Sequence, residues 1–384
     1  MTAPGLSVAR PRQNRAVIRA VGLAASSLIA LLAAEGVVRV VAPQVLQTPM
    51  FDHVDGLTVN RPNVRGRSYV PQDFDTTITT NSMGLRGSRE YTITPQPGIV
   101  RILTLGDSLT WGTGADDTAT YPAQLERTLR GGRTDEPQAV EVLNAGVGGT
   151  GTGEQAIYFA NRLARLRPRF VVLGVYYNDV YDDRQGFFVS TIDGIKPQSE
   201  MVLESRWRSA DRLQGLMRAT PGYWFLTQHS HLLNLARFAA ARMVSPSRAS
   251  APDTAVDVDR EVGDVLSAGL PLMSQEIEWL QRRVQDADGR LLVVCLPPRG
   301  AILDETTQDS LRERLIWRRL PSFLAAACRD KNIPFVDLTP AMRVRARAGR
   351  ALSYRHDFHP TPAGYEVIAA GVATLLEQVQ AGGQ

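Results

Sequence analysis

The sequence predicts an α/β fold, with a parallel sheet covered by helices on both sides. Three observations favour this fold. Short apolar runs recur after residue 99, stretches with helical spacing separate them, and polar or glycine-rich motifs follow where the runs end. That alternation is typical of βαβ units, in which loops at the carboxyl ends of the strands carry the functional residues. With 384 residues and 43% apolar side chains, the chain can bury one large core and carry additional segments.

The elements of this domain are predicted from composition and periodicity. Apolar runs of strand length cover residues 99–105, 140–143, 170–177, 290–296 and 333–338. Helical spacing of apolar residues is found over 122–130, 154–166 and 271–285. The last of these ranges begins with a proline, which favours the first turn of a helix.

The first apolar run ends at the motif Gly106-Asp107-Ser108. A serine on a tight turn at the end of a strand exposes its hydroxyl, and an adjacent glycine lets a substrate carbonyl approach the backbone. This placement predicts that Ser108 is a nucleophile. Because Gly-Asp-Ser is also ordinary turn chemistry, the prediction depends on the other motifs of the chain.

Three further motifs supply the other groups that acyl transfer requires. Residues 144–151 follow the second run, Asn178 closes the third, and Asp357-Phe358-His359 precedes a predicted helix. Together they offer a general base with a carboxylate to orient it, and donors for an oxyanion. Residues 146–151 also match the G-x-G-x-x-G dinucleotide pattern, but no acidic residue ends the next strand at a convincing distance.

With these four motifs in this order, the chain resembles the GDSL or SGNH hydrolase superfamily over roughly residues 80–380. The resemblance includes residues 81–87, which look like the lead-in of membrane-anchored bacterial members. It implies a three-layer α/β/α sheet of the flavodoxin-like type, and chemistry that needs no metal and no organic cofactor. It also implies that Ser108 is the nucleophile and that His359 is the base.

The resemblance further implies three oxyanion donors: the backbone N–H of Ser108, the N–H of Gly149 and the side-chain amide of Asn178. The acid is where the chain departs from the family. The usual Asp-x-x-His spacing would place the carboxylate at position 356, which is a histidine. We therefore expect Asp357, two residues before His359, to orient the imidazole.

Charge and cysteine content exclude several other classes of function. The net charge of +4 equals the charge of the N-terminal arginines, so the rest of the chain is near neutral and does not indicate a nucleic-acid partner. Cys295 and Cys328 are expected to be buried free thiols, and the histidine spacing indicates no metal site. These arginines, which precede the first acidic residue, are Arg10, Arg12, Arg15 and Arg19.

The N-terminal region is predicted to be a single-pass membrane anchor. Residues 1–19 form a basic cytoplasmic arm and residues 20–42 a transmembrane signal anchor, in which Glu35 and Arg39 stand four apart and can pair. The positive-inside rule then places the catalytic domain in the periplasm or outside the cell. A cleaved signal peptide is the alternative, although no clean small-x-small cleavage site is found near residues 33–34.

The remaining domain boundaries come from composition. Residues 43–98 are expected to be an irregular lead-in with a short strand or two near 75–79, since they are rich in Pro, Asn, Asp and Thr. The hydrolase domain is expected over 99–181 and 270–384, and residues 182–269 form an insertion that covers the active site or binds a partner. Within the insertion we expect helices over 206–218 and 223–243 and a mobile loop over 245–259.

The sequence therefore predicts a serine esterase or acylhydrolase whose substrate is an acyl ester, such as an acylated glycan or a lipid. Two alternatives stay open. The acyl group can be transferred to a sugar hydroxyl, as in cell-envelope O-acetyltransferases, or the chain can be a non-catalytic polysaccharide-binding or assembly protein with the same fold. The sequence does not indicate an oligomeric state.

Overall fold

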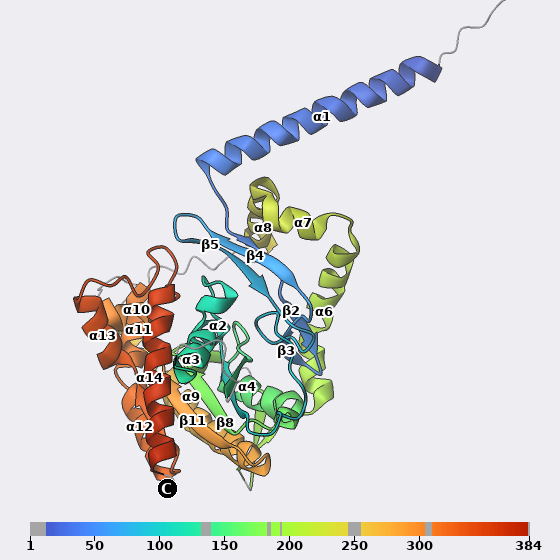
Figure 1. The fold of residues 1–384 in the computed structure, drawn as a ribbon. Coiled ribbons are helices and arrows are strands. Elements are labelled where there is room, and N and C mark those ends of the chain that lie inside the picture. Colours follow the sequence, from blue (N-terminus) through green and yellow to red (C-terminus); the bar gives the residue numbers. More distant parts are fainter. Residues whose placement is uncertain are drawn as a thin grey trace, which may run out of the picture.

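The computed structural model describes residues 13–131, 140–182, 186–192, 194–244, 255–303 and 309–382. A long helix, α1 (Gln13–Val41), stands apart from an α/β body and joins it at its C-terminal end (Figure 1). From residue 16 to residue 33 every side chain of α1 is exposed. Its stretch Ala16–Val41 is long and apolar enough to cross a membrane.

Within the described residues, the body is built on a five-stranded parallel sheet. The order is β7-β6-β8-β11-β12, which is 2-1-3-4-5 in chain order, a flavodoxin-like doubly wound arrangement. In such a sheet the functional crevice lies where the strand order reverses, which is here between β6 and β8. The strands are β6 (Val100–Gly106), β7 (Val140–Asn144), β8 (Phe170–Val175), β11 (Arg290–Cys295) and β12 (Phe335–Asp337).

Helices cover both faces of this sheet, and this confirms the predicted three-layer α/β/α fold. In β11, Leu291 and Val293 join one hydrophobic core, whereas Leu292 and Val294 join the other, as the two-residue period of a strand requires. The first face is covered by α4 (Thr152–Tyr158), α9 (Ala255–Asp286) and α12 (Leu320–Asp330). The second is covered by α3 (Tyr121–Leu129), α13 (Thr339–Arg347) and α14 (Pro362–Ala381).

Several short helices connect these layers. Helix α4 continues through a π-helical turn, η2 (Phe159–Leu163), and a 3₁₀ turn, η3 (Ala164–Leu166), so the three together cover the predicted helix over 154–166. The other connecting helices are α2 (Ser108–Trp111), η1 (Asp117–Ala119), α5 (Asp179–Asp182), α10 (Arg299–Leu303) and α11 (Asp309–Trp317).

Residues 43–98 contain the strand expected near 75–79, but they are more regular than expected, because they form two small antiparallel sheets. Asp55 and Gly56 both have positive φ, as a two-residue hairpin turn requires. In the last strand threonine occupies a buried position, so the alternation of apolar and polar residues is weak in the sequence. The strands are β1 (Leu46–Gln47), β2 (Phe51–Val54), β3 (Leu57–Asn60), β4 (Arg65–Val70) and β5 (Phe74–Thr79).

The insertion contains a hairpin followed by helices. The sequence predicted one helix over 223–243, but Ser230 separates two helices there. Its hydroxyl accepts a hydrogen bond from Leu233 N at 3.0 Å and so caps the start of the second helix. The elements are β9 (Phe188–Thr191), β10 (Gly194–Pro197), α6 (Glu200–Ala219), α7 (Tyr223–His229) and α8 (His231–Val244).

The expected boundary between residues 269 and 270 falls inside helix α9. Pro271 lies in the interior of that helix and not in its first turn, where proline is favoured. Of the loop expected over 245–259, residues 245–254 lie outside the described residues, and residues 255–259 are helical. The insertion and the hydrolase domain therefore share one continuous helix.

Candidate active site

Ser108 stands at the sharp turn between β6 and α2. Asp107 caps the helix, because its side chain accepts a hydrogen bond from Leu109 N at 2.9 Å. Gly106 has a φ of +152°, and a Cβ there would lie 2.1 Å from Thr110 Oγ1, so only glycine fits. The turn places the Ser108 side chain at the carboxyl edge of the parallel sheet, beside the point where the strand order reverses.

His359 brings its imidazole to Ser108 from 251 residues further along the chain. Its Nε2 lies 2.8 Å from Ser108 Oγ, and its Nδ1 lies 2.5 Å from Asp357 Oδ1. The same carboxylate oxygen accepts a hydrogen bond from the backbone N–H of His359 at 2.8 Å. The serine, the imidazole and the carboxylate therefore form one continuous hydrogen-bonded chain.

The loop between β7 and α4 comes over Ser108. Gly149 has a φ of +76°, and nothing lies within 4 Å of where its Cβ would be. At Gly148 a Cβ would lie 3.7 Å from Ser108 Cβ and 3.2 Å from Phe51 Cζ, so this glycine is the closer of the two to the serine side chain. Val147 N donates to Gly106 O at 2.9 Å and fixes the loop to the end of β6.

Asn178 follows β8 and lies beside the helix cap that precedes Ser108. Its side chain forms a hydrogen bond with the Asp107 carboxyl, and its backbone carbonyl oxygen accepts a hydrogen bond from Tyr181 N at 2.8 Å. Asp179 caps the same turn, since Oδ2 accepts from Tyr176 N at 2.8 Å. The carboxyl ends of β6 and β8 are thus linked through side chains at the point where the strand order reverses.

The family of this chain follows from a comparison of its sequence with known families. The sequence profile of the GDSL-like Lipase/Acylhydrolase family matches residues 104–367, more than half of the chain. The chain belongs to this family. It is therefore a hydrolase that acts on ester bonds, and the predicted resemblance is confirmed.

Solved structures give low-identity matches that each cover 72% of the chain. A protein described as lipolytic, of the G-D-S-L family, from Desulfitobacterium hafniense DCB-2 matches with 12% identity and a TM-score of 0.40 over 99% of its length. The enzyme LAE5 from the metagenome of Lake Arreo matches with 15% identity and a TM-score of 0.35 over 94%. A mutant of Axe2, an acetylxylan esterase from Geobacillus stearothermophilus, matches with 13% identity and a TM-score of 0.39 over 93%. No curated protein matches the sequence.

In this GDSL-like acylhydrolase the two carboxyl groups near the imidazole have different environments. Burial raises the pKa of Asp357, but the hydrogen bond and the charge of His359 outweigh burial and lower the pKa below its ordinary value. Asp107 is fully buried, and burial raises its pKa despite the opposing hydrogen bond from Leu109 N. Asp357 is therefore the carboxylate that stays ionised beside the histidine.

The loop that carries His359 is held by residues outside it. Asp73, in the turn between β4 and β5, accepts hydrogen bonds from Arg355 N at 3.2 Å and from His356 N at 2.8 Å. Arg299 donates from Nη1 to the carbonyl oxygens of Tyr354 at 2.7 Å and Arg355 at 2.6 Å. His356, at the family's usual position for the acid, thus contributes its backbone N–H to the loop. No sequence motif indicated these contacts.

Aromatic side chains around the site divide into buried and exposed groups. Trp111 and Tyr176 are buried, so they pack in the body and do not offer a face for a sugar ring. Phe358 is 51% exposed, and its ring stacks on His359 with 4.1 Å between centroids. Phe358 therefore shields one face of the imidazole, and sequence reasoning did not single it out.

Proposed function

We propose that this acylhydrolase is a membrane-anchored serine esterase that works through an acyl-enzyme outside the cytoplasm. The observation that carries the proposal is the hydrogen-bonded chain from Ser108 Oγ through His359 to Asp357, with distances of 2.8 and 2.5 Å. A serine, a histidine and a carboxylate in this order are the groups that activate a hydroxyl for attack on an ester.

In the first half of the reaction, Ser108 Oγ attacks the carbonyl carbon of the ester while His359 Nε2 accepts its proton. Asp357 holds the other imidazole proton on Nδ1 and stabilises the imidazolium. When the tetrahedral intermediate collapses, His359 gives the proton to the leaving alkoxide, and the acyl group stays on Ser108. Water then attacks the acyl-enzyme while His359 accepts its proton, and collapse of the second tetrahedral intermediate releases the carboxylic acid as His359 returns the proton to Ser108 Oγ.

The negative charge on the carbonyl oxygen needs donors already in place. We assign them to the backbone N–H groups of Ser108 and Gly149 and to the amide of Asn178. An asparagine amide has two N–H donors, so Asn178 can keep one on Asp107 and direct the other at the oxyanion. Asp107 is then the residue that positions the amide, and its capping bond to Leu109 N positions Ser108 at the same time.

The proposed location is supported by α1 and by the charges before it. Ala16–Val41 is long enough to span a bilayer, and arginines concentrate at its N-terminal side. We propose that α1 stays attached as an anchor, since Glu35 and Arg39 in its last turns bond to the body. The acyl ester would then be met on the outer side of the membrane.

The test is covalent labelling of the full chain with a fluorophosphonate, together with turnover of an aryl acetate. We expect labelling and turnover in the wild type, and loss of both in Ser108→Ala. Ser267→Ala, at an exposed serine on α9, is the matched control and should retain both. Absence of serine-specific labelling and of turnover in the wild type would favour the non-catalytic binding protein. An oligosaccharide that accepts the acyl group in place of water would assign the transferase reaction.

A further inference from the structure

Helices α7 and α8 lie next to the end of α1 (Figure 1), and each exposes two large apolar side chains. In α7, Phe225 is 63% exposed and Leu226 is also exposed. In α8, Phe238 is 48% exposed and Leu235 is also exposed. Large apolar side chains gathered on one surface mark a contact with a protein or a membrane. These four residues are called the α7–α8 face below.

The junction between α7 and α8 is bonded to the last turns of α1. The Glu35 carboxylate accepts hydrogen bonds from Ser230 Oγ at 2.8 Å, from His231 N at 2.9 Å and from Leu232 N at 2.9 Å. Because the first N–H groups of a helix have no partner inside it, Glu35 caps the N-terminus of α8 from another helix.

Arg39 completes this junction from the next turn of α1. Its Nη2 donates to His229 O at 2.7 Å, at the C-terminal end of α7, and also to Glu35 Oε1 at 3.1 Å. Gln44 N, just beyond α1, donates to His231 Nδ1 at 2.8 Å. The two ends that meet at the junction are therefore fixed to one short stretch of α1.

The positions of Glu35 and Arg39 along α1 determine how deep the junction lies in the bilayer. Residues 20–34 of α1 carry no charge, and 15 residues of helix measure about 22 Å, less than the roughly 30 Å of a hydrocarbon core. When α1 spans the membrane, Glu35 therefore lies at or just inside the outer edge of the core, and Arg39 lies one turn, about 6 Å, further out. Since the junction is bonded to these two residues, α7 and α8 lie at the level of the lipid headgroups.

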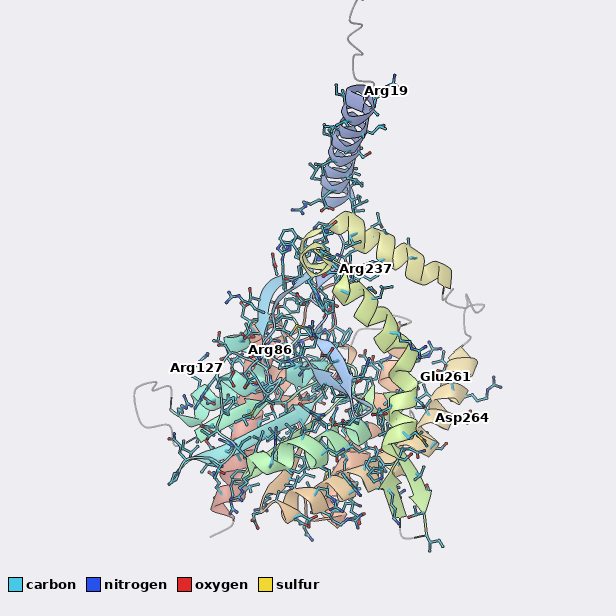
Figure 2. All side chains as sticks on the ribbon, turned by 90° about the vertical axis from the view of Figure 1, so that its right-hand side faces the viewer. Arg19, Arg86, Arg127, Arg237, Glu261 and Asp264 are labelled. Atoms are coloured by element: carbon cyan, nitrogen blue, oxygen red, sulfur yellow. The ribbon has the colours of Figure 1, made fainter. Side chains whose placement is uncertain are left out.

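The residue types around the α7–α8 face are those expected at the level of the lipid headgroups. The guanidinium of Arg61 lies 4.3 Å from the centroid of the Trp224 ring, and that of Arg237 lies 5.7 Å from Tyr223. Tryptophan, tyrosine and arginine are the side chains that concentrate at membrane interfaces, where their apolar parts meet lipid and their polar ends meet headgroups. Figure 2 places Arg237 directly below the end of α1.

We propose that the α7–α8 face lies in the outer interface of the same bilayer that α1 crosses. The esterase is then held by two membrane contacts, a span and an interfacial helix pair, and its body cannot turn freely about α1. This inference rests on the anchor in the proposed function. It assigns the exposed part of the insertion to a lipid surface.

The test places an environment-sensitive fluorophore on single cysteines in the full chain, reconstituted in vesicles of phosphatidylcholine and phosphatidylglycerol. Phe225→Cys and Phe238→Cys probe the α7–α8 face, Leu28→Cys probes α1, and Val344→Cys on the exposed side of α13 is the control. Both native thiols are fully buried and should not react. Turnover of an aryl acetate by each variant verifies that it is folded.

We expect lipid-attached nitroxides to quench the labels at positions 28, 225 and 238, and aqueous iodide to quench only the label at position 344. If iodide reaches positions 225 and 238 while position 28 stays in lipid, the inference is wrong and the anchor stands. If iodide also reaches position 28, the anchor itself is wrong. If both quenchers fail at 225 and 238, a second copy or a protein partner covers the face, which also contradicts the inference.

Discussion

The two kinds of sheet in the body contribute differently to the candidate active site. The loops after the parallel strands β6 and β7 bring Ser108 and the glycines beside it, and the chain after β12 brings His359. The antiparallel strands of residues 43–98 bring no reacting group, but Asp73 holds the loop that carries His359. Those residues also lie outside the span that matches the family profile.

The parallel sheet carries the candidate reacting groups, whereas the antiparallel segment before it supplies contacts that position one of them. A parallel sheet with this strand order brings the ends of distant strands to one crevice, and the candidate reacting groups lie there. We expect the distance between the imidazole and the serine to depend also on the hydrogen bonds of Asp73, in the turn between β4 and β5, which belong to the segment before that fold. Reactivity should therefore respond to changes in both sheets, and by different amounts.

The largest effect is expected for His359→Ala, which removes the proposed base. We expect kcat for an aryl acetate to fall by about 10⁴-fold or more, because the serine loses the group that accepts its proton. His356→Ala is the matched control, since His356 contributes its backbone N–H and its side chain is exposed. A loss smaller than tenfold in His359→Ala would contradict the proposed mechanism.

Asp357→Asn should follow, with kcat lower by about 10³- to 10⁴-fold. The amide can hold a proton toward Nδ1 and so favours the tautomer in which Nε2 cannot accept the serine proton. Steady-state kinetics with an aryl acetate measure the loss, and Asp330→Asn on the exposed end of α12 is the control. Equal activity of Asp357→Asn and the control would show that another group orients the imidazole.

Asp73→Ala tests the contribution of the antiparallel sheet. Without its carboxylate the loop at residues 355–356 loses two hydrogen bonds, and we expect kcat to fall roughly tenfold with little change in KM, since the reacting atoms are displaced. The free energy of unfolding should fall by only about 1 kcal/mol. Asp75→Ala, which breaks the ion pair with Arg67 in the same sheet, should leave kcat unchanged.

The smallest effect concerns acid stability. The lowered pKa of Asp357 means that its ionised form stabilises the fold above the ordinary value of 3.8, and that this contribution is lost as the pH falls through the lower value of the folded state. Urea unfolding of the wild type and of Asp357→Asn should therefore differ most above pH 4 and converge as the pH falls further below 3.8. A difference that grows below pH 4 would mean that the pKa is raised.

Local motifs made the parallel sheet predictable and pointed to Ser108 and His359, which the structure brings together. Ser108 stands at the end of an apolar run, and His359 was found by its resemblance to a family motif; both signals need only a few neighbouring residues. Asp73 gave no such signal, because a polar residue in a turn is ordinary and its partners lie 282 and 283 residues away. The catalytic roles of Ser108, His359, Asp357, Gly149 and Asn178 stay predictions.

Two other differences between the predicted and the observed elements occur at a proline and at a threonine. Pro271 indicated the start of a helix, but packing of α9 on the sheet tolerates it in the interior, where the sequence alone cannot show that support. Thr76 occupies a buried position of β5, so the strand lacks a clear apolar pattern. In both places tertiary contacts decide the structure against the local preference.

The long separation of Ser108 and His359 has a consequence for export. If the chain that follows α1 crosses the membrane in sequence order while α1 stays as the anchor, the serine emerges while its histidine, 251 residues later, is still being synthesised or waits on the cytoplasmic side. The protein is then inert throughout its passage. Ester-cleaving power arises only when nearly all of the polypeptide has arrived in the compartment where its substrates are found.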